Sequence, residues 1–319
     1  MDIGTLLVCR PMSDDQRARV EAALPETEII YREAMKASRE DVERADVIFG
    51  NVQPEYISGS KKLRWVQLTS AGADRYAPCM PSGAVLTNAT GAYGEPISEY
   101  MLGALLALRH KTCEYFDNQK KAEWRFCGRV REIPGSVCLV IGMGDIGGCF
   151  ARKMKAMGAY VIGIRRTDLR RPDYCDELYL LEDLDKVLPR ADVVALSLPN
   201  SPKTQGVLSA ERIAAMKQGA CVINVGRGSA IDQAALCAAL NDGRLGGACL
   251  DVTTPEPLPA DDPLWSAKNI LITPHIAGGR MLGSASETAV QIFLENVSLY
   301  LADEPLGHAV DLESGYRKL

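Results

Sequence analysis

Arg227, Glu256 and His275 combine an anion-binding group with a carboxylate and a histidine, and each follows an apolar segment late in the chain. The apolar segments that precede them are 220–225, 248–252 and 269–273, in that order. Because α/β proteins bind ligands at the carboxyl ends of parallel strands, three such residues after consecutive strands are expected to converge. Taken singly, Arg227 is equally well explained as an arginine whose stem covers apolar surface, and a lone histidine is usually structural.

These side chains are suited to proton transfer next to a bound carboxylate. The planar guanidinium of Arg227 offers a fork of donors that fits an anionic carboxylate and its neighbouring carbonyl oxygen. Histidine exchanges a proton near neutral pH, so His275 is the candidate acid–base. Of the chain's three histidines, His110 sits among basic residues and His308 lies near the end of the sequence, so we expect both at the surface.

A glycine motif predicts a dinucleotide site. An apolar strand is followed by Gly142, Gly144 and Gly147 at G-x-G-x-x-G spacing, then by a helix over 146–157 and a second apolar strand. Gly142 allows a tight turn, Gly144 leaves room for a pyrophosphate, and Gly147 lets the helix pack close to the strand. The strand–helix–strand context makes the motif more than a chance glycine turn. The residues assigned to the cofactor here are Gly142, Gly144, Asp145, Ile146 and Gly147.

The end of the second strand of this unit bears on the choice between NAD and NADP. NAD sites usually carry Asp or Glu there, but this chain reads Arg165-Arg166-Thr167. Two guanidiniums and a hydroxyl would bind a 2′-phosphate, whereas a carboxylate would repel it. We therefore expect NADP in preference to NAD. The alternative is a solvated basic turn, helped by Arg170 and Arg171.

A loop of small residues follows another expected strand, at Thr69–Asp74. Backbone N–H groups in such a loop can hold a carboxylate. By itself the segment is better explained as a plain turn. The candidate substrate contacts are Ser70, Ala71, Gly72 and Ala73, together with Arg227 and His275.

Strand-like and helix-like segments alternate along the chain, which predicts α/β units built on parallel sheets. The strands expected before residue 95 are 5–9, 28–31, 45–49, 63–68 and 84–87, with short helices at 39–44 and 54–57. One long helical pattern runs over 95–121, and four strands, at 191–196 and in the three apolar segments above, follow the dinucleotide unit. The amphipathic helix 284–301 has no strand after it, so we expect it to return to the first unit. The predicted domains are 1–95 plus 284–319, and 96–283.

Length and composition limit the function classes. With 319 residues and a net charge of −5, two domains are expected and nucleic acid is not an expected partner. The ten cysteines are scattered, without a C-x-x-C pair or a His/Cys cluster, so neither a metal site nor a disulfide framework is predicted. The N-terminus does not read as a signal peptide, and no apolar stretch is long enough to span a membrane. We expect a soluble, cytoplasmic protein.

Five motifs, in order along nearly the whole chain, resemble the D-isomer-specific 2-hydroxyacid dehydrogenase family. They are Ser70–Asp74, Gly142–Gly147, Asn224–Gly228, Asp251–Pro257 and Thr273–His275. Their combination is far more specific than the glycine motif alone. The resemblance implies NAD(P)-dependent reduction of a 2-oxo acid to a D-2-hydroxy acid, by a glyoxylate/hydroxypyruvate reductase or a broader 2-oxo acid reductase.

The resemblance also implies roles for the residues. Arg227, Glu256 and His275 would be the catalytic residues, in a cleft between the domains. Arg227 would hold the carboxylate and polarise the carbonyl oxygen, and His275 would donate the proton during reduction. Glu256 would bind the other ring nitrogen and favour the protonated imidazole. We also assign Pro199 and Asp251 to cofactor binding.

For the whole molecule, the resemblance implies a Rossmann-type dinucleotide domain inserted into a smaller flavodoxin-like substrate domain. It further implies a homodimer built largely by the dinucleotide domain. The expected ligands are a nicotinamide cofactor and a small 2-oxo or 2-hydroxy acid.

Three positions depart from the family's pattern. Tyr100 stands where many relatives have a histidine, Thr253 replaces an aromatic residue, and Arg165 replaces the acid of NAD sites. The first two leave the substrate open. The candidates for the pocket that selects it are Tyr93, Trp124, Arg280 and Met281, each with a packing or surface alternative.

Two alternative functions use the same fold. One is a dinucleotide-sensing scaffold or co-repressor, for which partner-docking extensions would be expected, whereas this sequence has essentially no tail beyond the fold. The other is an enzyme acting on formate or phosphite, and Glu256 argues against it because formate enzymes of this fold carry glutamine there.

Overall fold

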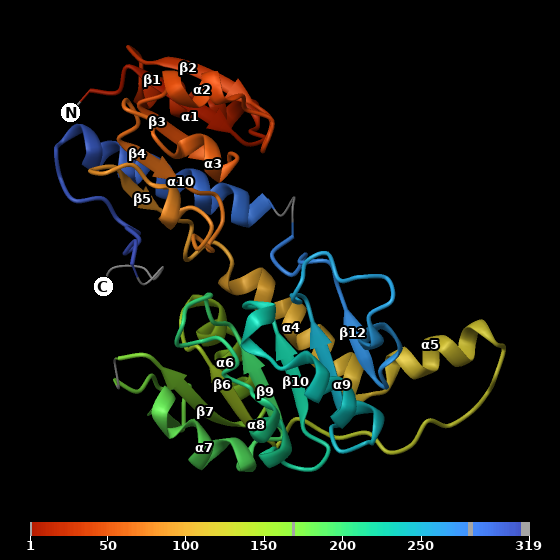
Figure 1. Cartoon of the computed structure of the whole chain (residues 1–319). Coiled ribbons are helices and arrows are strands. Elements are labelled where there is room, and N and C mark those ends of the chain that lie inside the picture. The colour runs from red at the N-terminus through yellow and green to blue at the C-terminus, as the bar shows by residue number, and fades with distance from the viewer. Residues whose placement is uncertain (1, 168–169, 280–282, 314–319) are drawn as a thin grey trace. The chain divides into compact units, whose positions relative to one another are not determined.

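The computed structural model describes residues 2–167, 170–279 and 283–313. The chain divides into two compact units, one formed by Met1–Tyr93 with Met281–Leu319 and the other by Gly94–Arg280 (Figure 1). Each unit is an α/β fold on a parallel sheet, so the predicted fold class is confirmed. The assignment of one unit to the substrate and the other to the cofactor stays a prediction.

Within the described residues, the first unit contains a five-stranded parallel sheet in the order β2-β1-β3-β4-β5. Its strands are β1 (Thr5–Cys9), β2 (Glu28–Arg32), β3 (Val47–Gly50), β4 (Trp65–Gln67) and β5 (Val85–Thr87). This is the flavodoxin-like order, in which the direction of strand addition reverses next to β1.

Helices cover both faces of this sheet. They are α1 (Asp14–Ala23), α2 (Arg39–Arg44), α3 (Pro54–Ile57) and α10 (Gly283–Leu301). On one face, α1 and α10 pack around Phe49 of β3, whose ring stacks on that of Phe293 with centroids 4.1 Å apart. On the other face, α2 and α3 pack around Ile48, the next residue along β3. The helix α10 therefore completes the core of the first unit, although the whole second unit separates it in sequence from the other elements of that core.

Within the described residues, the second unit contains a seven-stranded parallel sheet in the order β12-β11-β10-β9-β6-β7-β8. Its strands are β6 (Val137–Ile141), β7 (Tyr160–Arg165), β8 (Glu177–Leu180), β9 (Val193–Leu196), β10 (Cys221–Asn224), β11 (Gly247–Leu250) and β12 (Ile270–Ile272). This is the Rossmann order with one further strand, β12. The order reverses between β6 and β9, and ligands of α/β sheets bind at such switch points.

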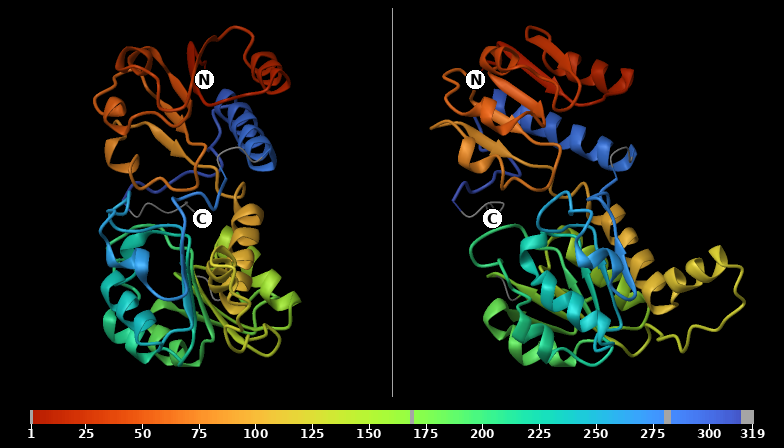
Figure 2. Two further views of the ribbon diagram at one scale, coloured as in Figure 1. Left: turned by 90° about the vertical axis from the view of Figure 1, so that its right-hand side faces the viewer. Right: turned by 45° about the vertical axis from the view of Figure 1, so that its right-hand side comes forward.

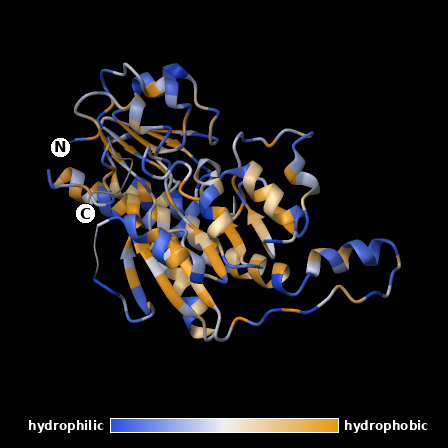
Figure 3. Cartoon of the chain, turned by 60° about the horizontal axis from the view of Figure 1, so that its bottom comes forward, coloured by the Kyte–Doolittle hydropathy of each residue, from blue (hydrophilic) through white to orange (hydrophobic). Residues whose placement is uncertain are grey.

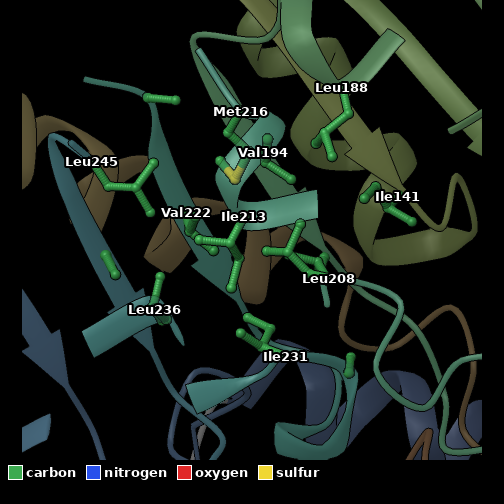
Figure 4. Close-up of a cluster of buried hydrophobic side chains, with 14 of the residues drawn as sticks. Ile141, Leu188, Val194, Leu208, Ile213, Met216, Val222, Ile231, Leu236 and Leu245 are labelled. Atoms are coloured by element: carbon green, nitrogen blue, oxygen red, sulfur yellow. The ribbon is translucent and has the colours of Figure 1, made fainter. Parts of the chain in front are cut away.

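The second sheet also has helices on both faces. They are α4 (Gly94–Arg109), α6 (Asp145–Ala156), α7 (Leu184–Val187), α8 (Ala210–Ala215) and α9 (Gln233–Asn241). Helices α4 and α6 pack together and against strands on one face, and α7, α8 and α9 cover the other. Figure 4 shows the second of these cores, where Val194 and Val222 of neighbouring strands meet Ile213 and Leu236. Burying such side chains contributes about 1.5–3 kcal/mol each, so the strands offer a rigid base for the loops at their ends.

Short 3₁₀ turns complete the described structure. They are Ala77–Cys79, Leu181–Asp183, Leu188–Arg190, Gly228–Ala230 and Pro263–Ser266. None of the helices among the described residues combines the length and apolar character needed to cross a membrane.

The single long helix expected over 95–121 is wrong, because two helices occupy this stretch. Helix α4 ends at Arg109 and α5 (Thr112–Lys120) begins after Lys111, whose φ of 58° is left-handed. A left-handed residue cannot continue a right-handed helix, so the chain turns there. Between 173 and 190, where the sequence suggests no element, the structure has β8 and α7. Strand β8 is a short edge strand, Glu177-Leu178-Tyr179-Leu180, and all four of its residues are half-buried.

Residues 112–131, here called the α5 arm, extend away from the sheet of the second unit (Figure 2). The arm consists of α5 and a following stretch without regular structure. Hydrophilic and hydrophobic residues are mixed along it (Figure 3). Its aromatic side chains Trp124 and Phe126 are 106% and 77% exposed, whereas the large aromatic residues of the two cores are buried.

Candidate active site

The carboxyl edge of the seven-stranded sheet carries the predicted site residues of the second unit. From β12 across to β7, the residues that follow the strands or end them are His275, Asp251 with Glu256, Arg227, Pro199, the glycine loop 142–147 and Arg165. Neighbouring strands lie about 4.8 Å apart, so loops after adjacent strands are neighbours in space. The acid–base candidates thus lie on one side of the switch point and the glycine loop on the other.

His275 and Glu256 form a hydrogen-bonded pair. Glu256 Oε2 lies 2.9 Å from His275 Nδ1, and Glu256 Oε1 accepts a hydrogen bond of 3.1 Å from the Thr253 N–H. The two side chains are 52% and 40% exposed, so the pair is accessible to solvent. With Nδ1 donating to the carboxylate, Nε2 is the ring nitrogen that can exchange a proton with a ligand.

Asp251 holds the loop on which His275 stands. Its Oδ1 accepts from Ile276 N at 2.8 Å, its Oδ2 accepts from Ala277 N at 2.9 Å, and its carbonyl accepts from His275 N at 2.8 Å. His275 itself has a left-handed φ of 54°, which is uncommon for a residue with a side chain. Asp251 is only 2% exposed, so its carboxylate is buried and bonds the loop from within the protein. Its predicted contact with the cofactor stays a prediction.

The turn that carries Arg227 is braced by its neighbours. The side-chain amide of Asn224 donates to Arg227 O at 2.8 Å, and its oxygen accepts from Gly226 N at 3.0 Å. A Cβ atom added to Gly228 would lie 2.1 Å from the Thr253 carbonyl carbon, so only glycine allows the two loops to approach this closely. The Arg227 turn therefore packs against the loop that leads to Glu256.

The glycine loop has the geometry expected of a phosphate-binding turn. Gly142 has φ of 100°, and its carbonyl accepts from Ser197 Oγ at 2.8 Å. A Cβ added to Gly147 would lie 2.1 Å from Gly142 O, whereas one added to Gly144 would meet no atom within 4 Å. Gly144 caps helix α6 without a side-chain hydrogen bond. A pyrophosphate can thus approach the backbone at Gly144 and the helix N-terminus, and the residues fit a dinucleotide.

Arg165 is the last residue of β7 and turns towards the glycine loop. Its Nε donates to Met143 O at 3.2 Å. Arg165 is half-buried, and Arg166 and Thr167 after it are exposed. The basic group therefore stands next to the turn that would hold the pyrophosphate. Pro199 follows β9 on the other side of β6, and its carbonyl accepts from Thr204 Oγ1 at 2.7 Å.

The predicted substrate loop, Ser70–Ala73, lies at the carboxyl edge of the sheet in the first unit, after β4. Two asparagines that the sequence analysis did not single out hold it. Asn51 donates to Ser70 Oγ at 3.2 Å, and Asn88 donates to Ala71 O at 2.8 Å. They follow β3 and β5, the two strands that flank β4 in the sheet. Asn51 and Asn88 reach this loop because of the order of the strands in the sheet, which the sequence does not state. No sequence signal therefore marked them.

The candidates for the substrate-selecting pocket lie in different parts of the molecule. Tyr93 hydrogen-bonds the Thr69 carbonyl just before the Ser70 loop. Trp124 lies fully exposed on the α5 arm. Arg280 and Met281 lie outside the described residues.

Comparison with known proteins points to one family. Residues 102–277 match the family model described as D-isomer specific 2-hydroxyacid dehydrogenase, NAD binding domain. A putative 2-hydroxyacid dehydrogenase of Haemophilus influenzae is 32% identical over 278 residues, which span 82% of this chain and 86% of the relative.

Two solved structures are similar over nearly their whole length. A D-isomer specific 2-hydroxyacid dehydrogenase family protein of Aeromonas salmonicida has a TM-score of 0.84 and 33% identity, covering 97% of this chain and 99% of that one. An NADPH-dependent glyoxylate/hydroxypyruvate reductase of Sinorhizobium meliloti, solved with NADP and sulfate, has a TM-score of 0.82 and 28% identity, covering 98% and 100%.

Proposed function

The chain belongs to the D-isomer specific 2-hydroxyacid dehydrogenase family, and from this premise we propose that it reduces a short 2-oxo acid, such as glyoxylate or hydroxypyruvate, with NADPH. It is an enzyme of the NAD(P)-dependent D-2-hydroxyacid dehydrogenase class, as predicted. The observation that carries the proposal is the hydrogen bond of 2.9 Å between His275 and Glu256, next to the strand end that bears Arg227. The similarity to a glyoxylate/hydroxypyruvate reductase supports a small substrate.

In the proposed mechanism, Arg227 binds the substrate carboxylate and polarises the adjacent carbonyl oxygen. When bound, the nicotinamide supplies the hydride that reduces the carbonyl carbon. His275 gives its Nε2 proton to the carbonyl oxygen, so that the N–H bond breaks as the new O–H bond forms. Glu256 keeps the ring oriented through Nδ1 and stabilises the protonated imidazole before transfer. In the reverse direction, the neutral ring accepts the hydroxyl proton.

A substrate panel tests the proposal. Purified protein is mixed with NADPH and, separately, with glyoxylate, hydroxypyruvate, pyruvate and a bulkier 2-oxo acid, and cofactor oxidation is followed by absorbance. We expect kcat/KM to be highest for glyoxylate or hydroxypyruvate. A clear preference for the bulkier acid would contradict the proposed substrate class while leaving the reaction type intact.

Arg165 supports NADPH over NADH as the preferred cofactor. It ends β7 beside the glycine loop, with its Nε 3.2 Å from Met143 O, and Arg166 follows it at the surface. A 2′-phosphate is close to dianionic at neutral pH and pairs well with guanidinium groups. One such charge-assisted bond at a partly exposed site corresponds to a preference of about tenfold.

We predict that Arg165→Asp erases or reverses this preference, because the new carboxylate repels the 2′-phosphate. The measurement is kcat/KM for both cofactors at low salt, with dissociation constants from the fluorescence of the reduced cofactors. Arg171→Asp is the matched control, since it makes the same charge change in the same basic stretch but its guanidinium bonds the Cys175 carbonyl. Equal use of NADPH and NADH by the wild type, or equal effects of the two substitutions, would contradict the role of Arg165.

The α5 arm supports a homodimer. Phe116, Trp124 and Phe126 are 57%, 106% and 77% exposed on a segment that extends from the second unit. Aromatic residues are enriched at protein interfaces, and a twofold dimer of identical chains is the commonest assembly. We therefore propose that the arm binds a second copy of this chain.

We predict a mass of about twice 34.6 kDa for the wild type in sedimentation experiments and a monomer for the Trp124→Ser, Phe126→Ser variant. Loss of interface anchors raises a dimer dissociation constant by at least about 30-fold. Trp265→Ser is the control, because Trp265 is also exposed, at 52%, but lies outside the arm. A wild-type monomer, or a double variant that dimerises like the control, would refute this interface.

A further inference from the structure

A chain of hydrogen bonds links helix α4 to the loop that carries His275. Tyr100 on α4 places its hydroxyl 2.5 Å from Thr273 Oγ1, and Thr273 Oγ1 lies 2.6 Å from Asp251 Oδ1. Asp251 in turn accepts from the N–H groups of Ile276 and Ala277, which directly follow His275. Three separate segments of the second unit, α4, the end of β11 and the loop 273–277 after β12, are thus joined through two hydroxyl groups and one carboxylate.

The direction of these bonds follows from counting protons. A carboxylate only accepts, so the single hydroxyl proton of Thr273 is donated to Asp251. Thr273 Oγ1 must then accept the proton of Tyr100, and the Tyr100 oxygen lies 3.2 Å from Cys249 Sγ. Burial raises the pKa of the Cys249 thiol to about 12, so the thiol is protonated and can donate to Tyr100. Burial also raises the pKa of Tyr100, which keeps its hydroxyl proton in place.

The network ends on a carboxylate that is almost fully enclosed. Asp251 is 2% exposed, and its two oxygens face different N–H groups of the loop. A rotation of this carboxylate would break at least one loop contact, and the Thr273 hydroxyl opposes such a rotation by holding Oδ1. The loop needs this restraint because His275 has a left-handed φ of 54°, a conformation that the surrounding contacts must maintain.

We propose that Tyr100 and Thr273 are positioning residues of the reaction: through Asp251 they fix the loop so that the His275 ring meets Glu256 and presents Nε2 to the substrate. The proposal rests on the acid–base role of His275 proposed above. It also gives a partner to Tyr100, one of the positions where the sequence departs from the family's pattern. Neither residue needs to touch the substrate.

The decisive comparison is Thr273→Val against Thr273→Ser. Valine keeps the shape of threonine but removes the hydroxyl, whereas serine keeps the hydroxyl. We expect Thr273→Val to lower kcat by about tenfold, because a buried carboxylate loses a donor, and Thr273→Ser to stay within about twofold of the wild type. The KM for the 2-oxo acid and the dissociation constant of NADPH should change by less than about threefold in both variants, because the network orients the proton donor.

Tyr100→Phe provides a second route to the same result if Thr273→Val folds poorly. Removing its hydroxyl should lower kcat by about three- to tenfold. Combined with Thr273→Val, it should add almost nothing, because Tyr100 acts through Thr273. Tyr160→Phe is the matched control. Tyr160 lies in the same unit and donates to Glu177 at 2.8 Å, but it begins β7 and so lies at the edge of the sheet opposite to the site. Its kcat should equal that of the wild type.

His275→Ala, measured in the same assay, separates failure of this proposal from failure of the proposed function. If His275→Ala is as active as the wild type, the proposed function fails. If His275→Ala is inactive but Thr273→Val and Tyr100→Phe keep the wild-type kcat, only the positioning role is overturned. Equal losses in Thr273→Val and Thr273→Ser, or a loss confined to KM, would also overturn it.

Discussion

Replacement of His275 with alanine is expected to lower kcat by about 10²- to 10⁴-fold while the protein still binds its cofactor. A positioned acid–base group contributes rate enhancement of this size. In the variant, water must protonate the carbonyl oxygen as it gains negative charge, because no other histidine follows a strand of this sheet among the described residues. Steady-state reduction of glyoxylate or hydroxypyruvate measures the loss, and NADPH fluorescence measures cofactor binding.

Two further variants control this result. His110→Ala removes a histidine that is exposed near the end of α4 and should leave kcat unchanged. Adding Glu256→Gln to His275→Ala should cause no additional loss, because Glu256 acts on the ring that the first substitution removes. A His275→Ala enzyme that keeps more than about a tenth of the wild-type turnover, when chemistry limits the rate, would mean that another group transfers the proton.

Replacement of Arg227 with alanine is expected to reduce both substrate affinity and turnover, with kcat/KM falling by about 10³-fold or more. Its guanidinium would bind the carboxylate in the ground state and the developing oxyanion in the transition state. Loss of one donor to an oxyanion alone reduces kcat by about 10²- to 10³-fold. Kinetics with the preferred 2-oxo acid give the two effects separately as KM and kcat.

A second substitution at the same position, Arg227→Lys, separates the role of the charge from that of the guanidinium shape. Arg227→Lys keeps the charge but loses the planar fork, so its kcat/KM should lie between those of the wild type and Arg227→Ala. The turn itself should persist in both variants, because Asn224 braces its backbone at Arg227 O and Gly226 N. An unchanged kcat/KM in Arg227→Ala would remove this residue from the active site.

Much of the fold follows from local sequence patterns. The buried strands of both sheets are apolar runs bounded by turn residues, and their alternation with helices confirms the predicted class. The glycine motif could be interpreted because its glycines are required by local geometry. Gly142 turns the chain, and Gly147 lies against the backbone at Gly142 O. Arg227, Glu256 and His275 could be grouped because all three follow strands of one parallel sheet. Their catalytic roles stay predictions.

Other features of the second unit were not predicted from the sequence. Strand β8 is a short edge strand of half-buried residues, and the sequence analysis assigned no strand there. The break between α4 and α5 depends on one left-handed residue, Lys111, inside a helical pattern. Tyr100 and Asp251 are 151 positions apart in the sequence, and Thr273 links them through its hydroxyl group. Only the packing of α4 against the sheet brings these side chains together. Oligomeric state and cellular location stay predictions.

The most direct test of the proposed reaction is the chirality of its product. The purified enzyme is given hydroxypyruvate and NADPH, and the glycerate formed is resolved on a chiral column while cofactor consumption is recorded. We predict D-glycerate, in a one-to-one ratio to the NADPH oxidised, from the wild type and almost none from His275→Ala. Formation of L-glycerate, or no NADPH oxidation with hydroxypyruvate or any other 2-oxo acid of the panel, would contradict the proposed function.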